Sequence, residues 1–280
     1  MIKKIFKFIL EKKGTYLEQI YDNTSDQTYN AESIFINIGS GNFYKKGWLS
    51  LDAETEIFSD RHQEAISNKA FIPFVIKEGV RLPFDDNSVD IVYCSHVLEH
   101  LKVSDMKYII KEFYRCLKEN GLIRIAVPDA DLGYRALLYK NTEYFNWNKR
   151  TRIGIEESEI DYFIDLICSA KSIFYNDSFF SLDEKLNCRL KVKNMIDDKK
   201  SKEEIFNFLI DSSSDLRFDF AGHINWFNYK KLHSILEDSL FKDIWKSSRN
   251  ASISSEMQNR KYFDRTHPQF SLYVEAVKQI

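Results

Sequence analysis

Five short apolar runs are spaced along the chain between residues 33 and 127, and each has the length of a buried strand. They lie at 33–38, 48–52, 71–76, 89–94 and 122–127. Between the last two runs, apolar side chains recur every three or four residues from Ser104 to Leu117, which predicts an amphipathic helix. Ser104 is expected to cap the start of this helix, and Gly121 lies just past its end. Strands that alternate with helices predict an α/β fold with a mostly parallel sheet.

The pattern changes after residue 135. Residues 136–220 carry few strand signals, and their apolar and aromatic side chains recur mostly at helical spacing. A further amphipathic helix is expected near 230–240, followed by strands at 241–245 and 271–277. We therefore predict three parts: an N-terminal helix and connector at 1–30, an α/β domain built from 31–135 and 221–280, and a helical insertion at 136–220 after the fifth strand.

The amino acid composition narrows the class of protein. The sequence has 280 residues, 44% of them hydrophobic, and no apolar run approaches the about 18 residues that a membrane span requires. Its 40 basic and 42 acidic residues nearly balance, which argues against duplex nucleic acid as a partner because phosphate binding usually requires a basic excess. The four cysteines form no Cys-x-x-Cys pair, so no cysteine-based zinc site is expected.

The first residues show no pattern of a secretory signal, and we expect a soluble, cytoplasmic protein. Residues 1–13 predict a basic helix with Ile and Phe side chains on one side. Such a helix could contact a membrane surface, although packing on the domain is the favoured interpretation. The sequence does not predict an oligomeric state.

A Gly-Ser-Gly sequence at 39–41 follows the first predicted strand. Ligands of parallel α/β sheets bind beyond the carboxyl ends of the strands, and glycine lets the backbone approach a ligand closely. Asp52 ends the second predicted strand, where its carboxylate can accept both hydroxyls of a ribose. A dinucleotide loop would need a third glycine, where Tyr44 stands, and an acid about 20 residues further on. By itself the loop fits a simple turn equally well.

Six segments, the first of which contains this loop, occur in one order along the chain. They are residues 37–41, 47–52, 82–90, 95–100, 112–121 and 124–129. Together they resemble the class I S-adenosylmethionine-dependent methyltransferases, in the small-molecule branch called type 11. The resemblance covers about 33–135 and resumes at 221–280. It implies a Rossmann-like sheet whose last strand is antiparallel, with S-adenosylmethionine as cofactor and S-adenosylhomocysteine as product.

The same resemblance assigns a set of cofactor-binding residues. They are Asn37, Gly39, Ser40, Gly41, Asp52, Glu78, Gly79 and Ser95. The 39–41 loop would pass under the methionine part of the cofactor, with Ser95 on the same side. Asp52 would hold the ribose, and Glu78 with Gly79 would contact the adenine.

Two features depart from the family pattern. Asn37 stands where an acid is usual, so it can hydrogen-bond the ammonium group of the cofactor but cannot pair with its charge. The connection from Gly39 to Gly47 is shorter than the about 10–12 residues of a crossover with its helix. We therefore expect the usual first helix to be curtailed or absent.

Methyl transfer from a sulfonium is an in-line displacement, and an oxygen nucleophile also needs a base. The catalytic candidates are His96, Glu99, His100 and His223. His96 directly follows the fourth strand and is the best placed. Glu99 and His100 fit a structural pair at a helix start as well, and His223 fits a packed residue as well. We expect no metal, although these four side chains offer an alternative divalent-cation site, similar to the Glu-x-x-Glu-His arrangement of some RNA-end methyltransferases.

We predict O-methylation of a small molecule, such as a sugar or a nucleotide-linked or phosphoryl precursor of a bacterial surface polysaccharide (a capsule, for example). The insertion at 136–220 would then cover the substrate as a lid. Lys45, Lys46 and Arg135 could supply charge to a phosphoryl group. The alternatives are an RNA methyltransferase and a non-catalytic cofactor-binding scaffold.

The remaining aromatic and histidine residues receive structural interpretations. The aromatic residues Tyr134, Tyr139, Tyr144, Phe145 and Trp147 are expected mainly in a core. His62, His233 and His267 show no partner in the sequence and are expected at the surface or in packing.

Overall fold

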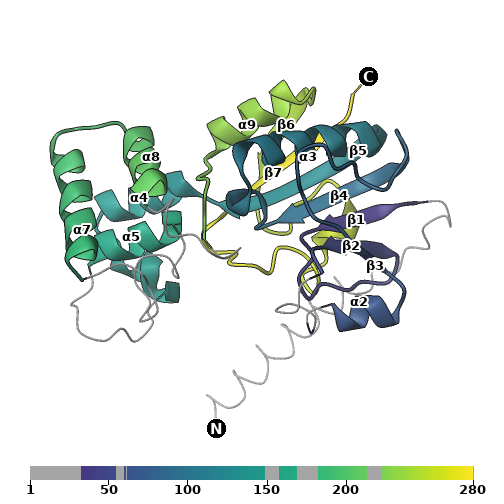
Figure 1. Ribbon diagram of the computed structural model, residues 1–280, viewed down its shortest axis with the longest axis horizontal. Coiled ribbons are helices and arrows are strands. Elements are labelled where there is room, and N and C mark those ends of the chain that lie inside the picture. Colours follow the sequence, from purple (N-terminus) through teal and green to yellow (C-terminus); the bar gives the residue numbers. More distant parts are fainter. Residues whose placement is uncertain are drawn as a thin grey trace, which may run out of the picture.

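The computed structural model describes residues 33–54, 60, 62–148, 158–168, 182–212 and 222–279. The predicted helix and connector at 1–30 lie outside these residues. The described part consists of a twisted sheet with its covering helices and a second group of helices beside it (Figure 1). None of the described helices is both long and apolar enough to cross a membrane.

Seven strands form one sheet. They are β1 (Phe35–Ile38), β2 (Trp48–Asp52), β3 (Phe71–Pro73), β4 (Val89–Ser95), β5 (Leu117–Pro128), β6 (Asp243–Ser247) and β7 (Ser271–Val277). Their order across the sheet is β3-β2-β1-β4-β5-β7-β6. The first five strands pair in parallel, whereas β7 is antiparallel to both of its neighbours. This arrangement confirms the predicted Rossmann-like sheet with an antiparallel last strand.

Two helices, α3 (Val103–Cys116) and α9 (Tyr229–Asp238), cover one face of the sheet (Figure 1). The apolar side chains of both helices pack with alternate residues of the central strands in the main core. The predicted cap of α3 is wrong, because the helix begins one residue before Ser104 and its N-cap is Lys102, with no side-chain bond. The helix ends at Cys116, one residue before the predicted end at Leu117, and the backbone becomes extended at Leu117 and enters β5 directly, so Gly121 lies within β5.

The connection between β1 and β2 contains no helix, as expected from its length. Residues 39–47 are all described and form turns. On this second face of the sheet, Phe35, Trp48 and Tyr93 pack instead against Met257 and Phe263. These partners belong to the segment between β6 and β7, whose only helical part is the 3₁₀ helix η5 (Ser255–Gln258). A short helix, α2 (Gln63–Ser67), lies beside β3 at the edge of the sheet (Figure 1).

The second group of helices has a core of its own. It comprises α4 (Ala130–Leu138), the 3₁₀ helix η3 (Thr142–Asn148), α5 (Glu159–Cys168), α7 (Leu182–Asp197) and α8 (Lys202–Ser212). We call these elements the helical group. Their core extends from Ala130 to Trp226, a few residues beyond the predicted insertion at 136–220 on both sides.

The aromatic residues of this region have different environments. Phe145 is fully buried in the core of the helical group, and Tyr134 and Tyr144 pack partly buried against it. Tyr139 is 83% exposed, so the expectation of a core position is wrong for this residue. The side chain of Trp147 lies outside the described part of the structure.

Candidate cofactor and catalytic site

A cavity of about 280 Å³ lies beyond the carboxyl ends of β1, β2 and β4. Its walls come from the turn after β1, the end of β2, the segment after β3 and the turn after β4. The lining residues are Ile38, Gly39, Gly41, Leu51, Asp52, Ala53, His62, Phe74, Val75, Ile76, His96, Val97, His100 and Leu101. Its volume is close to the lower limit of about 300 Å³ for small-ligand sites. The cavity therefore lies where a ligand of a parallel α/β sheet is expected.

The backbone of the 39–41 loop is shaped by its two glycines. Gly39 has a φ of +63°, and a Cβ at this position would lie 2.3 Å from Cγ2 of Val97. The amide of Gly39 donates to the carbonyl oxygen of Leu51 over 2.8 Å, which holds the loop against β2. Gly41 also has a positive φ of +53°, but a Cβ there would meet no atom within 4 Å. The loop is therefore packed tightly on one side and leaves free space at Gly41, which lines the cavity.

The carboxylate of Asp52 is held by two backbone amides. One oxygen accepts a hydrogen bond from the amide of Gly41 and the other from the amide of Ala53, each over 2.7 Å. A carboxylate oxygen has a second lone pair, so each can still accept a hydroxyl group. Asp52 lines the cavity, where a ribose could reach it.

His62 is a site residue that sequence reasoning missed. The residue is 2% exposed, lines the cavity and stacks on Phe71 with 4.5 Å between the ring centroids. Its Nδ1 lies 2.9 Å from the carbonyl oxygen of Gly41, which can only accept, so Nδ1 carries a hydrogen. In the neutral ring Nε2 is then a bare acceptor, and this atom is buried without a hydrogen-bond partner among the described residues. The buried ring agrees with the packing position expected from the sequence, whereas its contact with Gly41 could not be seen in the sequence.

Besides Ser40, four of the residues assigned to the cofactor do not line the cavity. Asn37 is buried within β1, and Ser95 is the last residue of β4. Glu78 and Gly79 are exposed beyond the apolar segment that lines the cavity, and the amide of Glu78 donates to Asp105. The roles proposed for these four residues stay predictions.

Ser40 lies within the 39–41 loop and Lys45 shortly after it, and the two residues differ in their contacts. Ser40 is 7% exposed, and its hydroxyl group has no hydrogen-bond partner in the described part of the chain. Lys45 is buried and forms a 2.5 Å ion pair with Glu256. Its ammonium is therefore already paired, contrary to the expectation that it could serve a phosphoryl group.

His96 connects β4 to the cavity in an unusual backbone conformation. Its φ is +56°, which is uncommon for a residue with a bulky side chain and often marks a functional site. The ring is fixed on both sides: Nε2 lies 2.8 Å from Oγ of Ser271, and Nδ1 lies 3.1 Å from Oε1 of Glu99. Because Ser271 is the first residue of β7, His96 connects the turn after β4 to a distant part of the chain.

The four catalytic candidates form one cluster, in which three histidines lie around the buried carboxylate of Glu99. Glu99 is 1% exposed, and its Oε1 lies 3.1 Å from His96 and 4.0 Å from Nε2 of His100. Burial acts to raise the pKa of Glu99, but His96, His100 and His223 outweigh it and lower the pKa to about 2. Glu99 is therefore ionised at neutral pH.

His223 reaches this cluster from a distant part of the chain. The amides of Ile224 and Asn225 donate to the carbonyl oxygen of Glu99 over 2.7 and 3.1 Å, which ties the segment after the helical group to the turn after β4. The ring of His223 lies 5.0 Å from that of His100. Burial lowers the pKa of His223 to about 4, despite the opposing effect of Glu99. The ring is therefore neutral near pH 7.

Of the other two histidines, His267 contacts this cluster at His96 and His233 lies apart from it. His267 stacks on Phe270, and its ring centroid is 5.7 Å from that of His96. His233 lies on α9 and forms an ion pair with Glu237. Both positions agree with the packing and surface roles expected from the sequence.

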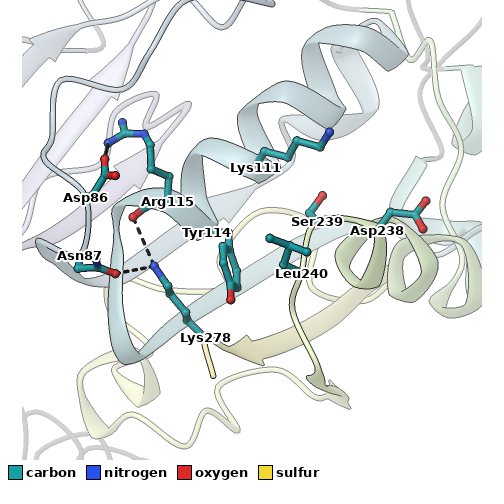
Figure 2. A pocket seen from close by; sticks show the side chains of 9 residues that line it. All are labelled: Asp86, Asn87, Lys111, Tyr114, Arg115, Asp238, Ser239, Leu240 and Lys278. Atoms are coloured by element: carbon teal, nitrogen blue, oxygen red, sulfur yellow. Dashed lines mark hydrogen bonds and ion pairs between the residues drawn. The ribbon is translucent and has the colours of Figure 1, made fainter. Parts of the chain in front are cut away.

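A second hollow of about 500 Å³ lies at the amino ends of the parallel strands (Figure 2). Two of its cationic groups already have partners. Arg115 bonds Asp86 and Glu112, each over 2.7 Å. The ammonium of Lys278 donates to Asn87 over 2.7 Å and to the carbonyl oxygen of Leu117 over 2.9 Å. The first cavity is the stronger candidate, because its lining includes Nε2 of His62, a buried atom without a hydrogen-bond partner among the described residues.

Comparison with known proteins assigns a family to part of the chain. Residues 42–125 match the family model of a methyltransferase domain. An uncharacterized protein of Methanocaldococcus jannaschii is 30% identical over 103 residues, which are 37% of this chain and 42% of that relative. The chain thus matches less than half of the length of this relative.

Solved structures align over most of the chain at low similarity. A chain from the complex that contains the Haloferax volcanii Trm112 methyltransferase activator aligns with a TM-score of 0.44 and 12% identity, covering 98% of this chain and 95% of its own. A SAM-dependent methyltransferase from Aquifex aeolicus aligns with a TM-score of 0.41 and 9% identity, covering 93% and 88%. The Haemonchus contortus phosphoethanolamine N-methyltransferase 2, in complex with S-adenosyl-L-methionine, gives 0.42 and 10%, covering 95% and 53%.

Proposed function

We propose that this chain, which contains a methyltransferase domain at residues 42–125, is an S-adenosylmethionine-dependent methyltransferase with its cofactor in the cavity beside the 39–41 loop. One observation carries the location of the site. The open backbone at Gly41 and the fixed carboxylate of Asp52 meet in a cavity at the carboxyl ends of the parallel strands. This is where ligands of such sheets bind.

The polar atoms of the cavity fit a nucleoside. Asp52 is proposed to accept the two ribose hydroxyls, since both of its oxygens keep a free lone pair. The buried Nε2 of His62 and the hydroxyl of Ser40 have no hydrogen-bond partner among the described residues. A bound cofactor would supply a donor or an acceptor for each of them. The apolar side chains of Phe74 and Ile76 line the cavity and offer a surface for the adenine ring.

The methyl acceptor is proposed to enter beside His96 and His100, which line the same cavity. We infer an oxygen acceptor on a small molecule, such as a sugar or a nucleotide-linked or phosphoryl precursor of a surface polysaccharide. Two observations support a small acceptor with a removable proton: the near-neutral charge of the chain and the imidazoles on the cavity wall. The helical group is proposed to cover this acceptor, because His223, directly after it, lies beside His100.

Calorimetric titration with S-adenosylhomocysteine tests the cofactor site. The wild type is expected to bind, and Asp52→Ala is expected to weaken binding about 100-fold, because two hydrogen bonds to a charged group are lost. Asp243→Ala is the matched control, since this exposed carboxylate at the start of β6 lies away from the cavity. Equal affinities of the wild type and Asp52→Ala, or no binding by the wild type, would reject the proposed site.

A screen for S-adenosylhomocysteine formation tests the acceptor class. We expect turnover with free, phosphorylated or nucleotide-linked sugars and none with RNA. Turnover with RNA alone would support the alternative function instead. Cofactor binding without turnover on any acceptor would favour a non-catalytic scaffold.

A further inference from the structure

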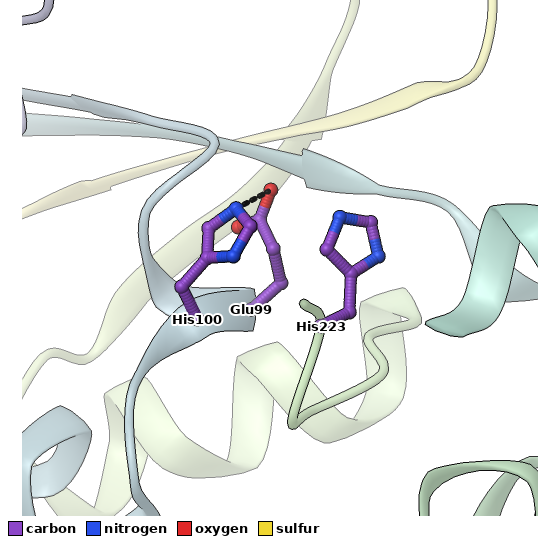
Figure 3. A group of neighbouring side chains, drawn as sticks. All are labelled: Glu99, His100 and His223. Atoms are coloured by element: carbon purple, nitrogen blue, oxygen red, sulfur yellow. Dashed lines mark ion pairs between the residues drawn. The ribbon is translucent and has the colours of Figure 1, made fainter. Parts of the chain in front are cut away.

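Three potential metal ligands converge on one point next to the cavity. Glu99 and His100 belong to the 3₁₀ helix η2 (Leu98–His100), and His223 follows the helical group. One carboxylate oxygen and one ring nitrogen from each histidine all lie within 4.8 Å of one another. Figure 3 shows the three side chains turned toward one another from these two segments.

The carboxylate of Glu99 is unusual for a buried charge. It is 1% exposed, and neither oxygen has a hydrogen bond of good geometry in the described part of the structure. Its nearest polar contact is Nδ1 of His96, which lies 3.1 Å from Oε1. Burying a carboxylate costs several kcal/mol unless hydrogen bonds, ion pairs or a metal compensate for the lost water. The structure thus holds a buried anion with unused lone pairs.

The tautomer of His100 leaves a nitrogen free on the side of this anion. Its Nδ1 lies 3.0 Å from the carbonyl oxygen of Gly222, so Nδ1 carries the hydrogen of the neutral ring. The lone pair of Nε2 is then on the side of Glu99, at 4.0 Å from Oε1. Metal-bound histidines commonly donate their other N–H group to a carbonyl or carboxylate in this way.

We propose that Glu99, His100 and His223 bind a divalent transition-metal ion, with His96 as a positioning residue for Glu99. Two imidazoles and one carboxylate form a donor set of catalytic zinc sites, which keep a fourth position open. Magnesium and calcium prefer oxygen ligands, so the two nitrogen donors favour zinc or a similar late transition metal over them. The proposal replaces the sequence-based expectation of no metal, and it moves His96 out of the ligand set because His96 already contacts Glu99 and Ser271.

The position of the site suggests its role, and this step rests on the proposed function. His100 is at once a proposed ligand and part of the cavity wall. The ion would therefore lie beside the proposed acceptor position. Its open position would be available to an oxygen of the acceptor or of water.

Titration of chelator-treated full-length protein with Co²⁺ tests the site without any turnover. We expect the visible absorption bands of a tetrahedral or five-coordinate Co²⁺ ion at one ion per chain, which Zn²⁺ displaces. His223→Ala and Glu99→Gln are expected to weaken Co²⁺ binding by about 100-fold or more, because each removes one ligand. His96→Asn is expected to weaken it by about 10- to 100-fold, as for residues that orient a ligand. His233→Ala is the matched control, since this histidine on α9 pairs with Glu237.

Two further measurements make the result decisive. Zn²⁺ should raise the Tm of the wild type but not of His223→Ala, which separates loss of the site from misfolding. S-adenosylhomocysteine affinity should be unchanged in His223→Ala, because His223 does not line the cavity. Equal Co²⁺ binding by the wild type and the ligand variants, or none by the wild type, would overturn the metal site alone. Normal Co²⁺ binding with no S-adenosylhomocysteine binding would overturn the proposed function alone.

Discussion

The two faces of the sheet are covered by different kinds of structure. On the first face, apolar strand residues pack against α3 and α9 in an almost purely hydrophobic core. On the second face, strand positions that point inward include Arg124 and Glu275, both fully buried. Their cover is the irregular segment between β6 and β7. The difference shows how buried charges can hold a non-helical segment on a sheet.

The charges on the second face bind the backbone of this irregular segment. Arg124 forms ion pairs with Asp264 over 2.6 Å and Glu275 over 2.8 Å, and it donates to the carbonyl oxygen of Ser248. The two carboxylates accept the amides of Asn250 and Ile253, over 2.6 and 3.2 Å. A helix satisfies its own backbone groups, whereas an irregular segment needs partners from elsewhere. On this face some of these partners come from the strands, through Arg124 and Glu275, and Asp264 within the segment itself supplies another.

Of the substitutions that compare the two faces, one that breaks the charged network should lower the free energy of unfolding the most. Arg124→Met is expected to lower the free energy of unfolding by about 3–5 kcal/mol, because it leaves Asp264 and Glu275 buried without their cation. Urea denaturation measures the loss. Lys200→Met is the control, since Lys200 and its partner Glu204 are 52% and 53% exposed and the loss should be smaller. Equal losses for both variants would show that the buried network does not have a special role.

The loss of a single hydrogen bond between the sheet and the same segment should lower the free energy of unfolding by an intermediate amount. The indole N–H group of Trp48 donates to Glu256 over 2.7 Å, and both side chains are buried. Trp48→Phe is expected to cost about 2 kcal/mol, as for the loss of a hydrogen bond to a charged group. Trp245→Phe, at a partly buried position beside the same cluster, should cost less in the same denaturation experiment. A loss below that of Trp245→Phe would argue against the role of this bond.

The apolar face should respond least to a conservative change. Ile110 of α3 is fully buried in the main core, and Ile110→Val removes one methylene group. We expect a loss of about 1 kcal/mol in the free energy of unfolding. Calorimetric melting checks this value. A loss as large as that of Arg124→Met would mean that both faces tolerate change equally poorly.

The sequence predicts the apolar face and the sheet well. Strands with clear boundaries, such as 48–52 and 271–277, have the predicted ends. The third strand is shorter than predicted and ends at Pro73, because proline cannot donate to a ladder and confines strands to edges. Periodicity detects apolar side chains. It does not detect Arg124, because a charged residue inside an apolar run gives no sign of a distant partner such as Asp264.

The same limit applies to the candidate site: features at strand ends can be predicted, whereas contacts between distant segments cannot. The 39–41 loop and Asp52 could be predicted, because both lie at strand ends in a recognisable spacing. The role of His62 could not, since its partner Gly41 is 21 residues away with no periodic pattern between them. The contact between His100 and His223 likewise depends on how the chain returns after the helical group.

The bond between Trp48 and Glu256 also has a consequence for the order of folding, because the two residues are 208 positions apart. The side chain that satisfies the indole group of β2 is therefore synthesised 208 residues after the indole itself. Contacts of such long sequence separation slow folding, since a long loop must close before they form. We therefore expect the sheet to remain open on its second face until the segment that contains Glu256 has been made, and only then to reach its final stability.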